Sequence, residues 1–255
     1  MLTPAKKKKL ISSLKLYRKR FLSNRAQNLD ESGTRLMINS LLEGILGYAS
    51  IDEIKTEYMI KGTYADYVIQ LGGVRHFLVE VKALSLTLSD KHLRQAKHYG
   101  ADEGIDWIVL TNGKFLDLYR VLFLKPVESI RVFSIDLSDA SQLKVAAEFL
   151  QFMHKDSVKK KGLNSLWNKH VALDPKLVAS LLFEKPVVNY LKRTLKRKSK
   201  SKISDQEVVH SLNRIIAEKI ELNELKQVRV SKRTSKKPRV KNPTNTQVSS
   251  ALADV

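Results

Sequence analysis

Three charged side chains stand inside otherwise apolar segments of the sequence, and their types could support hydrolytic chemistry. Glu80 and Lys82 lie on either side of a valine in the run 78–83, and Asp66 lies in the preceding apolar run. Side chains on a β-strand alternate between its two faces, so Glu80 and Lys82 share one face and the neighbouring valines point to the other. Because charged groups in a partly buried sheet need partners, we expect these three residues to interact.

The chemistry that these residue types favour is metal-assisted hydrolysis of a phosphodiester. Two converging carboxylates suit Mg²⁺, which prefers oxygen ligands, and the backbone carbonyl of Val81 would add a further oxygen. An ammonium at Lys82 would position or deprotonate a water molecule, or stabilise charge on a phosphate. A metal ion, a water and an ammonium supply what phosphodiester hydrolysis needs. The alternative is a plain salt bridge between Glu80 and Lys82 on an exposed strand.

The elements around these residues must bring Asp66 close to Glu80. Their apolar and β-branched content predicts short strands over 55–60, 64–71 and 76–83. A pair of glycines separates the last two segments, and such a short connection lets two strands pair antiparallel. In that hairpin the carboxylates of Asp66 and Glu80 would lie near each other.

Helices and further strands are predicted on both sides of this hairpin. Apolar residues from Ile38 to Leu46 recur at helical spacing, with Asp30 or Ser32 as a cap and Gly47 at the end. The other predicted elements are a helix from Ser89 or Asp90 to Gly100, strands over 106–111, 114–121 and 131–137, and a helix over 139–153. The order is helix, three strands, helix, strand and strand, which indicates a mixed α/β core.

The charge of the chain is strongly positive and unevenly distributed. The 255 residues carry 46 Lys and Arg against 26 Asp and Glu, a formal net charge of +20. Residues 1–25 carry nine basic and no acidic residues, residues 26–149 carry 13 basic and 17 acidic, and residues 150–255 carry 24 basic and 9 acidic. Two basic segments around an acidic middle favour a nucleic acid partner, bound through its phosphates without reading its sequence. The plainer alternative is that lysine-rich ends keep the protein soluble.

The carboxy-terminal part differs in composition from the predicted core. Short helical pieces are expected at 163–167 and 175–183, and Ser204 with Glu207 forms a capping box for a further helix. The stretch before that helix is basic, and its candidate nucleic-acid-binding residues are Lys192, Arg193, Lys196, Arg197, Lys198, Lys200 and Lys202. Apolar periodicity disappears towards the end, so we predict that 231–255 is disordered.

These patterns divide the chain into four segments and exclude several classes of protein. The segments are a basic amino-terminal arm over 1–25, a core over 26–153, a basic helical region over 154–230 and a disordered tail over 231–255. The absence of cysteine excludes disulfides, thiolate zinc sites, iron–sulfur clusters and a cysteine nucleophile. No segment approaches the roughly 18 apolar residues of a membrane span, and no apolar signal core follows the first lysines. We therefore expect a cytoplasmic, nucleoid-associated protein.

At this point the chain resembles a known family. The pattern of Asp66 followed by Glu80, Val81 and Lys82, in this order of helices and strands, is similar to the PD-(D/E)xK nuclease superfamily. More narrowly, it resembles the amino-terminal nuclease domain of type I restriction enzyme R subunits, over roughly 28–135. The narrower likeness rests on the segments 30–35, 46–48, 65–67, 79–83 and 110–113, and on Gln95 with Tyr99.

The resemblance implies a fold and a role for each matching residue. The fold would be a restriction-endonuclease-like α-β-β-β-α-β core with a mixed sheet flanked by helices. Asp66 and Glu80 would bind Mg²⁺ or Mn²⁺, and Lys82 would be catalytic. An acid on the first helix would sit near the metal, best matched by Glu31, although Glu43 lies on the same helix. Supporting roles fall to Gln95 and Tyr99, which share one helix face and could orient DNA or the catalytic lysine.

Departures from the family limit the function that the resemblance implies. Ala65 replaces the proline in the motif's name, which changes no ligand. The chain lacks a G-x-x-x-x-G-K-[ST] phosphate loop, so it has no ATP site and cannot drive translocation by itself. The leading hypothesis is a metal-dependent DNA endonuclease, acting alone or with modification, specificity or motor subunits. The competing hypothesis is a non-catalytic DNA-binding or adaptor protein on a nuclease-like scaffold.

Overall fold

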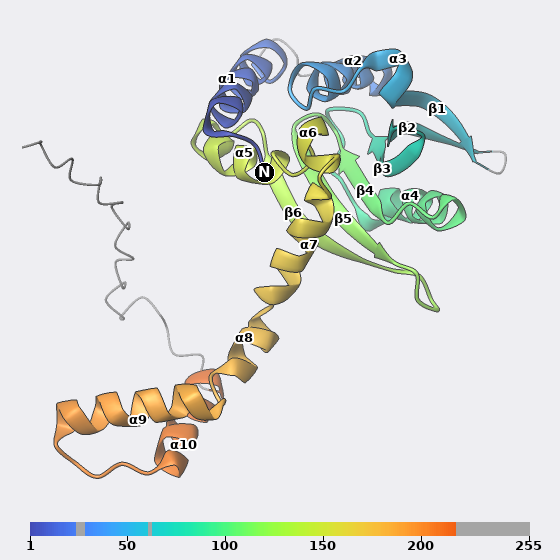
Figure 1. Ribbon diagram of the computed structural model, residues 1–255. Helices are drawn as coiled ribbons and strands as arrows, with labels where there is room; N and C mark the ends of the chain where they lie inside the picture. Colours follow the sequence, from blue (N-terminus) through green and yellow to red (C-terminus); the bar gives the residue numbers. More distant parts are fainter. Residues whose placement is uncertain (24–28, 61–62, 218–255) are drawn as a thin grey trace, which may run out of the picture. The chain divides into compact units, whose positions relative to one another are not determined.

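A computed structural model describes residues 1–23, 29–60 and 63–217 (Figure 1). The strands are β1 (Ile54–Ile60), β2 (Thr63–Leu71), β3 (Val74–Val81), β4 (Trp107–Thr111), β5 (Phe115–Leu122) and β6 (Glu128–Asp136). The helices are α1 (Pro4–Phe21), α2 (Glu31–Gly44), α3 (Ser50–Glu53), α4 (Asp90–Glu103), α5 (Leu143–Leu150), α6 (Lys155–Val158), α7 (Gly162–Ala172), α8 (Pro175–Leu181), α9 (Lys185–Ser199) and α10 (Asp205–Ala217), with a 3-10 turn η1 (Ala140–Gln142). Residues 1–184 form one compact unit, and α9 with α10 belongs to a second.

The six strands form one mixed sheet in the order of the sequence, β1 to β6. Strands β3 and β4 are parallel and are joined through α4, whereas the other neighbouring pairs are antiparallel. This confirms the predicted α/β class and the predicted hairpin of β2 and β3, in which Tyr67 pairs with Val79 and Val68 pairs with Leu78. The hairpin turns at Gly72 and Gly73, whose φ angles of +56° and +79° lie in the left-handed region that favours glycine.

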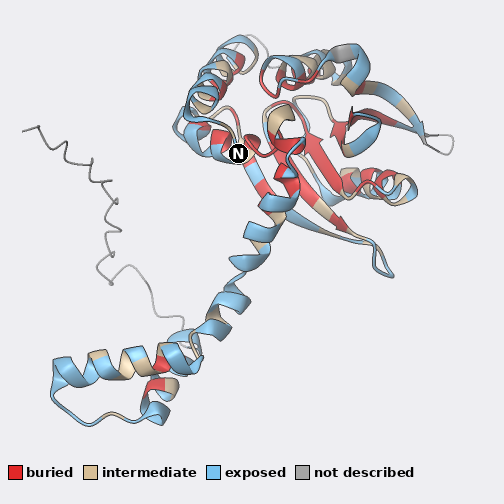
Figure 2. Cartoon of the chain, in the orientation of Figure 1, coloured by how far each residue is buried: buried red, intermediate tan, exposed pale blue. Residues whose placement is uncertain are grey.

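Helices cover both faces of the sheet and create two apolar cores (Figure 2). On one face α4 buries Leu93, Ala96 and Tyr99 against strand residues that include Leu78 and Leu110. The opposite face is covered by α1, α2 and α5, whose buried apolar residues are Leu10, Leu14, Tyr17, Met37, Ile38, Leu41, Leu42, Leu143, Ala146, Ala147 and Leu150. Because side chains alternate along β3, Glu80 lies on the same face of the strand as Leu78, the face that α4 covers.

The basic amino-terminal segment contains a helix that the sequence patterns did not indicate. In α1, Leu10, Leu14 and Tyr17 recur at helical spacing and are buried, while most of the lysines and arginines remain on the outside. The Tyr17 hydroxyl donates a hydrogen bond of 2.8 Å to the carbonyl of Gly113, in the turn between β4 and β5. The charge of this segment therefore lies on a helix that packs against α5 and α2.

Other element boundaries differ from those predicted. Helix α2 ends at Gly44 rather than at Gly47, and the helix expected over 139–153 is divided into η1 and α5. The basic stretch before the last helix is itself helical, as α9, and the capping box of Ser204 with Glu207 is confirmed by a hydrogen bond of 2.7 Å from the Ser204 amide to the Glu207 carboxylate. The predicted disordered tail lies outside the described residues. None of the helices in the described ranges is long and apolar enough to cross a membrane.

Candidate active site

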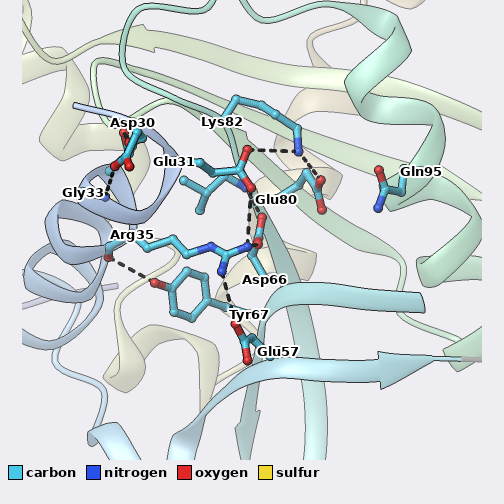
Figure 3. Close-up of polar contacts among 12 residues, drawn as sticks. Asp30, Glu31, Gly33, Arg35, Glu57, Asp66, Tyr67, Glu80, Lys82 and Gln95 are labelled. Atoms are coloured by element: carbon cyan, nitrogen blue, oxygen red, sulfur yellow. Dashed lines mark hydrogen bonds and ion pairs between the residues drawn. The ribbon is translucent and has the colours of Figure 1, made fainter. Parts of the chain in front are cut away.

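Asp66 contacts the strand that carries Glu80, as the hairpin predicted (Figure 3). The pairing of β2 with β3 ends at Tyr67 and Val79, and Asp66 and Glu80 are the next residues beyond that pair on the two strands. The Asp66 side chain is 7% exposed, and its Oδ2 accepts a hydrogen bond of 2.7 Å from the backbone N–H of Val81. The backbone N–H of Val81, rather than its carbonyl, contacts Asp66 in this structure. This hydrogen bond fixes the orientation of the Asp66 carboxylate.

Glu80 and Lys82 form a close ion pair at the end of β3. The ammonium Nζ of Lys82 donates to Oε1 of Glu80 at 2.6 Å. Glu80 is 2% exposed, and within the described part of the chain its second oxygen, Oε2, is buried without a hydrogen-bond partner. A buried carboxylate oxygen without a donor is costly unless a cation or a donor occupies the space beside it.

The protonation behaviour of this pair follows from burial and from the surrounding charges. Burial, together with the nearby carboxylates of Asp66 and Glu31, raises the pKa of Glu80 to about 7, although Lys82 opposes the shift. Burial acts against the charge of Lys82, but the carboxylates around it outweigh burial and raise the Lys82 pKa. The raised pKa favours the ammonium form of Lys82, which donates hydrogen bonds.

The helical acid next to this pair is Glu31 rather than Glu43. Glu31 lies in the first turn of α2, and its Oε2 is 3.9 Å from Nζ of Lys82. Glu43 lies near the other end of α2, about 18 Å away at 1.5 Å per residue. There it lines a separate hollow with residues that include Lys6 and His154. The geometry favours Glu31 as the acid that belongs to the site.

Arg35 is a further member of the site that sequence reasoning did not assign. Its guanidinium makes a close ion pair with Asp66 and lies 3.4 Å from Oε1 of Glu31 and 3.3 Å from Oε1 of Glu57. Figure 3 shows the guanidinium between Asp66 and Glu57. The available signal was the spacing of Glu31 and Arg35, which are i and i+4 on α2 and so share one face of the helix.

Hydrogen bonds tie α2 to β2 and to the segment that follows β3. The buried hydroxyl of Thr34 accepts a bond of 3.0 Å from the backbone N–H of Leu84. The hydroxyl of Tyr67 donates a bond of 3.0 Å to the backbone carbonyl of Arg35. These contacts determine where the side chains of Glu31 and Arg35 lie relative to the two strands.

Gln95 and Tyr99 interact with each other on α4, as their spacing predicts. The side-chain amide of Gln95 donates to the Tyr99 hydroxyl at 2.5 Å. Tyr99 is buried in the core beneath α4, whereas Gln95 is exposed. Figure 3 shows Gln95 on α4 next to Glu80 and Lys82. Of the two residues, Gln95 is the one placed to meet a bound molecule.

The carboxylates of this site fit a divalent cation that keeps some of its water ligands. The charge of Asp66 acts on Glu80, and within the described residues the buried Oε2 of Glu80 has no hydrogen-bond donor beside it, so it is available as a ligand. In the described ranges no group of three or more His, Asp or Glu side chains is arranged to hold a metal ion. Mg²⁺ commonly takes one or two carboxylates and completes its shell with water and substrate oxygens, so two carboxylates suffice for it.

The basic residues predicted to bind nucleic acid lie mainly on α9 and remain largely exposed. Lys192 differs from the rest, because it forms an ion pair with Asp205 at the start of α10. The exposed members are Arg193, Lys196, Arg197, Lys198, Lys200 and Lys202. They form a surface of one charge sign on the second compact unit.

No protein-family model matches the chain, and no curated protein is significantly similar to it. Among solved structures, a chain of the cryoEM structure of the DrdV–DNA complex is similar over 57% of this chain and 96% of that chain, with 18% sequence identity and a TM-score of 0.40.

Proposed function

We propose that this protein is a metal-dependent DNA endonuclease of the PD-(D/E)xK type, with its active centre at the carboxyl end of β3. The observation that carries the proposal is the clustering of Asp66, Glu80 and Lys82, in which Oε2 of Glu80 is buried without a partner among the described residues. A buried, charged cluster of this kind is costly for folding alone and is typical of sites that bind a ligand or perform catalysis.

Each residue of the centre has a task that follows from its contacts. Asp66 and Glu80 would hold a divalent metal ion, which when bound would supply an activated water and neutralise charge on the phosphate. Lys82 stays protonated and donates hydrogen bonds to the attacking water or to a phosphate oxygen. Glu31 lies 3.9 Å from that ammonium and orients it from the side of α2. Gln95 contacts the nucleic acid from α4.

The substrate class follows from charge. The formal net charge of +20 draws the chain towards a polyanion, and the exposed lysines and arginines of α9 can each contact a phosphate. Such contacts hold the backbone of a nucleic acid without selecting its sequence. A phosphodiester is then the bond presented to the centre.

The test compares two isosteric substitutions of buried aspartates. Asp66→Asn removes a metal-binding charge, and we expect it to lower cleavage of a covalently closed plasmid in Mg²⁺ by about a hundredfold or more. Asp117→Asn is the matched control, because Asp117 is equally buried on the same sheet, two strands from Glu80 with Leu110 between them. Equal activity of the two variants would refute the assignment. Binding of DNA without cleavage in any metal would favour the adaptor hypothesis.

A second prediction concerns the basic surface of α9. Substituting Arg193, Lys196 and Arg197 with glutamine should weaken DNA binding and flatten its dependence on salt, with the slope falling by about 0.9 for each phosphate that the protein no longer neutralises. Fluorescence anisotropy with a labelled duplex at a series of salt concentrations measures the slope. Lys192→Gln is the matched control and should change it less, because Lys192 is already paired with Asp205. An unchanged slope in the triple variant would remove α9 from the DNA interface.

A further inference from the structure

Arg35 occupies a position that a simple structural ion pair does not explain. One guanidinium is shared among three carboxylates, those of Asp66, Glu31 and Glu57 (Figure 3). Its contact with Asp66 is the closest of the three, and Asp66 is one of the two carboxylates that converge on the proposed metal position. In this structure Arg35 therefore neutralises a carboxylate that a metal ion would also neutralise.

The balance of charge indicates that Arg35 and a divalent cation compete. Among the described residues, these four carboxylates, from Glu31, Glu57, Asp66 and Glu80, pair with two cationic side chains, Arg35 and Lys82. A divalent cation would neutralise the remaining negative charge. At Asp66, however, it would lie close to the positive guanidinium of Arg35, and like charges at such short range repel. Binding of the metal ion to Asp66 thus weakens the binding of the Arg35 guanidinium to the same carboxylate, and the reverse also holds.

The other contacts of Arg35 are weak enough for its side chain to move once a metal ion binds Asp66. The partner carboxylates lie at the surface, with the side chain of Glu57 72% exposed and that of Glu31 41% exposed, so these pairs are weak. Within the described residues, the Nε of Arg35 is buried without an acceptor, so its present position leaves one of its donors unused. A hollow of about 380 Å³ lined by Arg35, Glu57, Tyr64, Ala65 and Asp66 lies directly beside it.

The chemistry of the guanidinium indicates what it would bind next. It is planar, always charged and presents paired N–H donors that match two oxygens of a phosphate. We propose that Arg35 holds Asp66 only in the metal-free protein, yields it to the metal ion, and then binds a phosphate oxygen of the substrate. This inference rests on the proposed function, because it requires a metal ion at Asp66 and a phosphodiester beside it.

Equilibrium binding of Mn²⁺ in the absence of DNA tests the competition directly. We expect Arg35→Gln to bind Mn²⁺ about tenfold more tightly than the wild type, and Arg35→Lys, which keeps the charge, to resemble the wild type. A purely structural role for Arg35 predicts the opposite, because a disturbed site binds metal less well. Arg131→Gln is the matched control, since Arg131 pairs with the buried Asp117 outside the site, and its Mn²⁺ affinity should not change.

The second arm measures DNA binding with Ca²⁺ in place of the catalytic metal. Arg35→Gln should then bind a short duplex about tenfold more weakly than the wild type, despite its tighter metal binding. If Arg35→Gln binds Mn²⁺ no more tightly than the wild type, Arg35 and the metal ion do not compete. If Arg35→Gln binds the duplex as tightly as the wild type, Arg35 does not contact a phosphate. A wild type that binds no Mn²⁺ contradicts the proposed function itself, so this failure is distinguishable from the first two. Thermal unfolding of each variant shows that it is folded.

Discussion

Lys82→Ala is expected to lower DNA cleavage by about 10²- to 10⁴-fold, the range found when a positioned donor or proton-transfer group is removed. Lys82 pairs with Glu80 at 2.6 Å and lies 3.9 Å from Glu31, so the substitution removes the only one of these three side chains that can donate to a phosphate or a water. DNA binding should be largely retained, because the exposed basic residues of α9 are untouched.

The control for Lys82→Ala separates loss of the ammonium from loss of a positive charge anywhere on the chain. Lys55→Ala removes a lysine of β1 whose ammonium donates to the backbone carbonyl of Ile51, and it should cleave DNA as the wild type does. Mn²⁺ binding to Lys82→Ala should be as tight as in the wild type or tighter, because a cation next to the metal has been removed. Cleavage near the wild-type rate in Lys82→Ala would remove Lys82 from the mechanism.

Glu80→Gln is expected to stabilise the metal-free protein at pH 8 by about 1–3 kcal/mol while abolishing cleavage. The folded state raises the pKa of Glu80 from 4.5 to about 7, chiefly through burial, and each unit corresponds to about 1.4 kcal/mol. We expect a gain in the free energy of unfolding towards the lower end of this range, because the substitution also removes the charged partner of Lys82. Glutamine keeps the shape of the side chain and an oxygen that accepts from Lys82.

The sign of the pH dependence follows from the raised pKa. Below pH 4.5 Glu80 is protonated in both the folded and the unfolded states, so its stabilising contribution is fully present. That contribution is lost as the pH rises through about 7, because the folded protein must then bury a charge. Urea unfolding in EDTA should therefore show a gap between Glu80→Gln and the wild type that shrinks as the pH falls from 8 to 5.

The matched control for Glu80→Gln is Glu31→Gln, whose carboxylate also lies near Lys82 but is 41% exposed. We expect a much smaller change in the free energy of unfolding for this variant, because an exposed carboxylate is hydrated in both states. A wild type that is more stable than Glu80→Gln at pH 8 would show that the Glu80 carboxylate contributes to the fold rather than opposing it.

The strands and the pair of carboxylates could be predicted because local rules determine them. Alternation along a strand places Glu80 and Lys82 on one face, and a short glycine turn requires β2 and β3 to pair antiparallel. These two facts are enough to bring Asp66 beside Glu80, and the structure places its carboxylate within hydrogen-bonding distance of Val81. The i, i+4 spacing of Gln95 and Tyr99 is equally local, and the two side chains do bond to each other.

The parts that could not be predicted depend on how separate elements pack. The pairing of Arg35 with Asp66 requires α2 to lie against β2, a long-range arrangement that no local pattern contains. Helix α1 was obscured because its lysines and arginines dominate the composition, although Leu10, Leu14 and Tyr17 form a buried stripe. The pairing of Lys192 with Asp205 likewise depends on the way α9 meets α10.

The proposed nuclease activity is tested most directly by metal-dependent cleavage of covalently closed plasmid DNA by the wild-type protein, followed by gel electrophoresis. A closed circle has no ends, so any product reports an internal break. We expect nicked or linear DNA with Mg²⁺ or Mn²⁺, none in EDTA, and recovery of cleavage when excess Mg²⁺ is added back. Cleavage that continues in EDTA, or no cleavage with either metal, would contradict the proposal of a metal-dependent endonuclease.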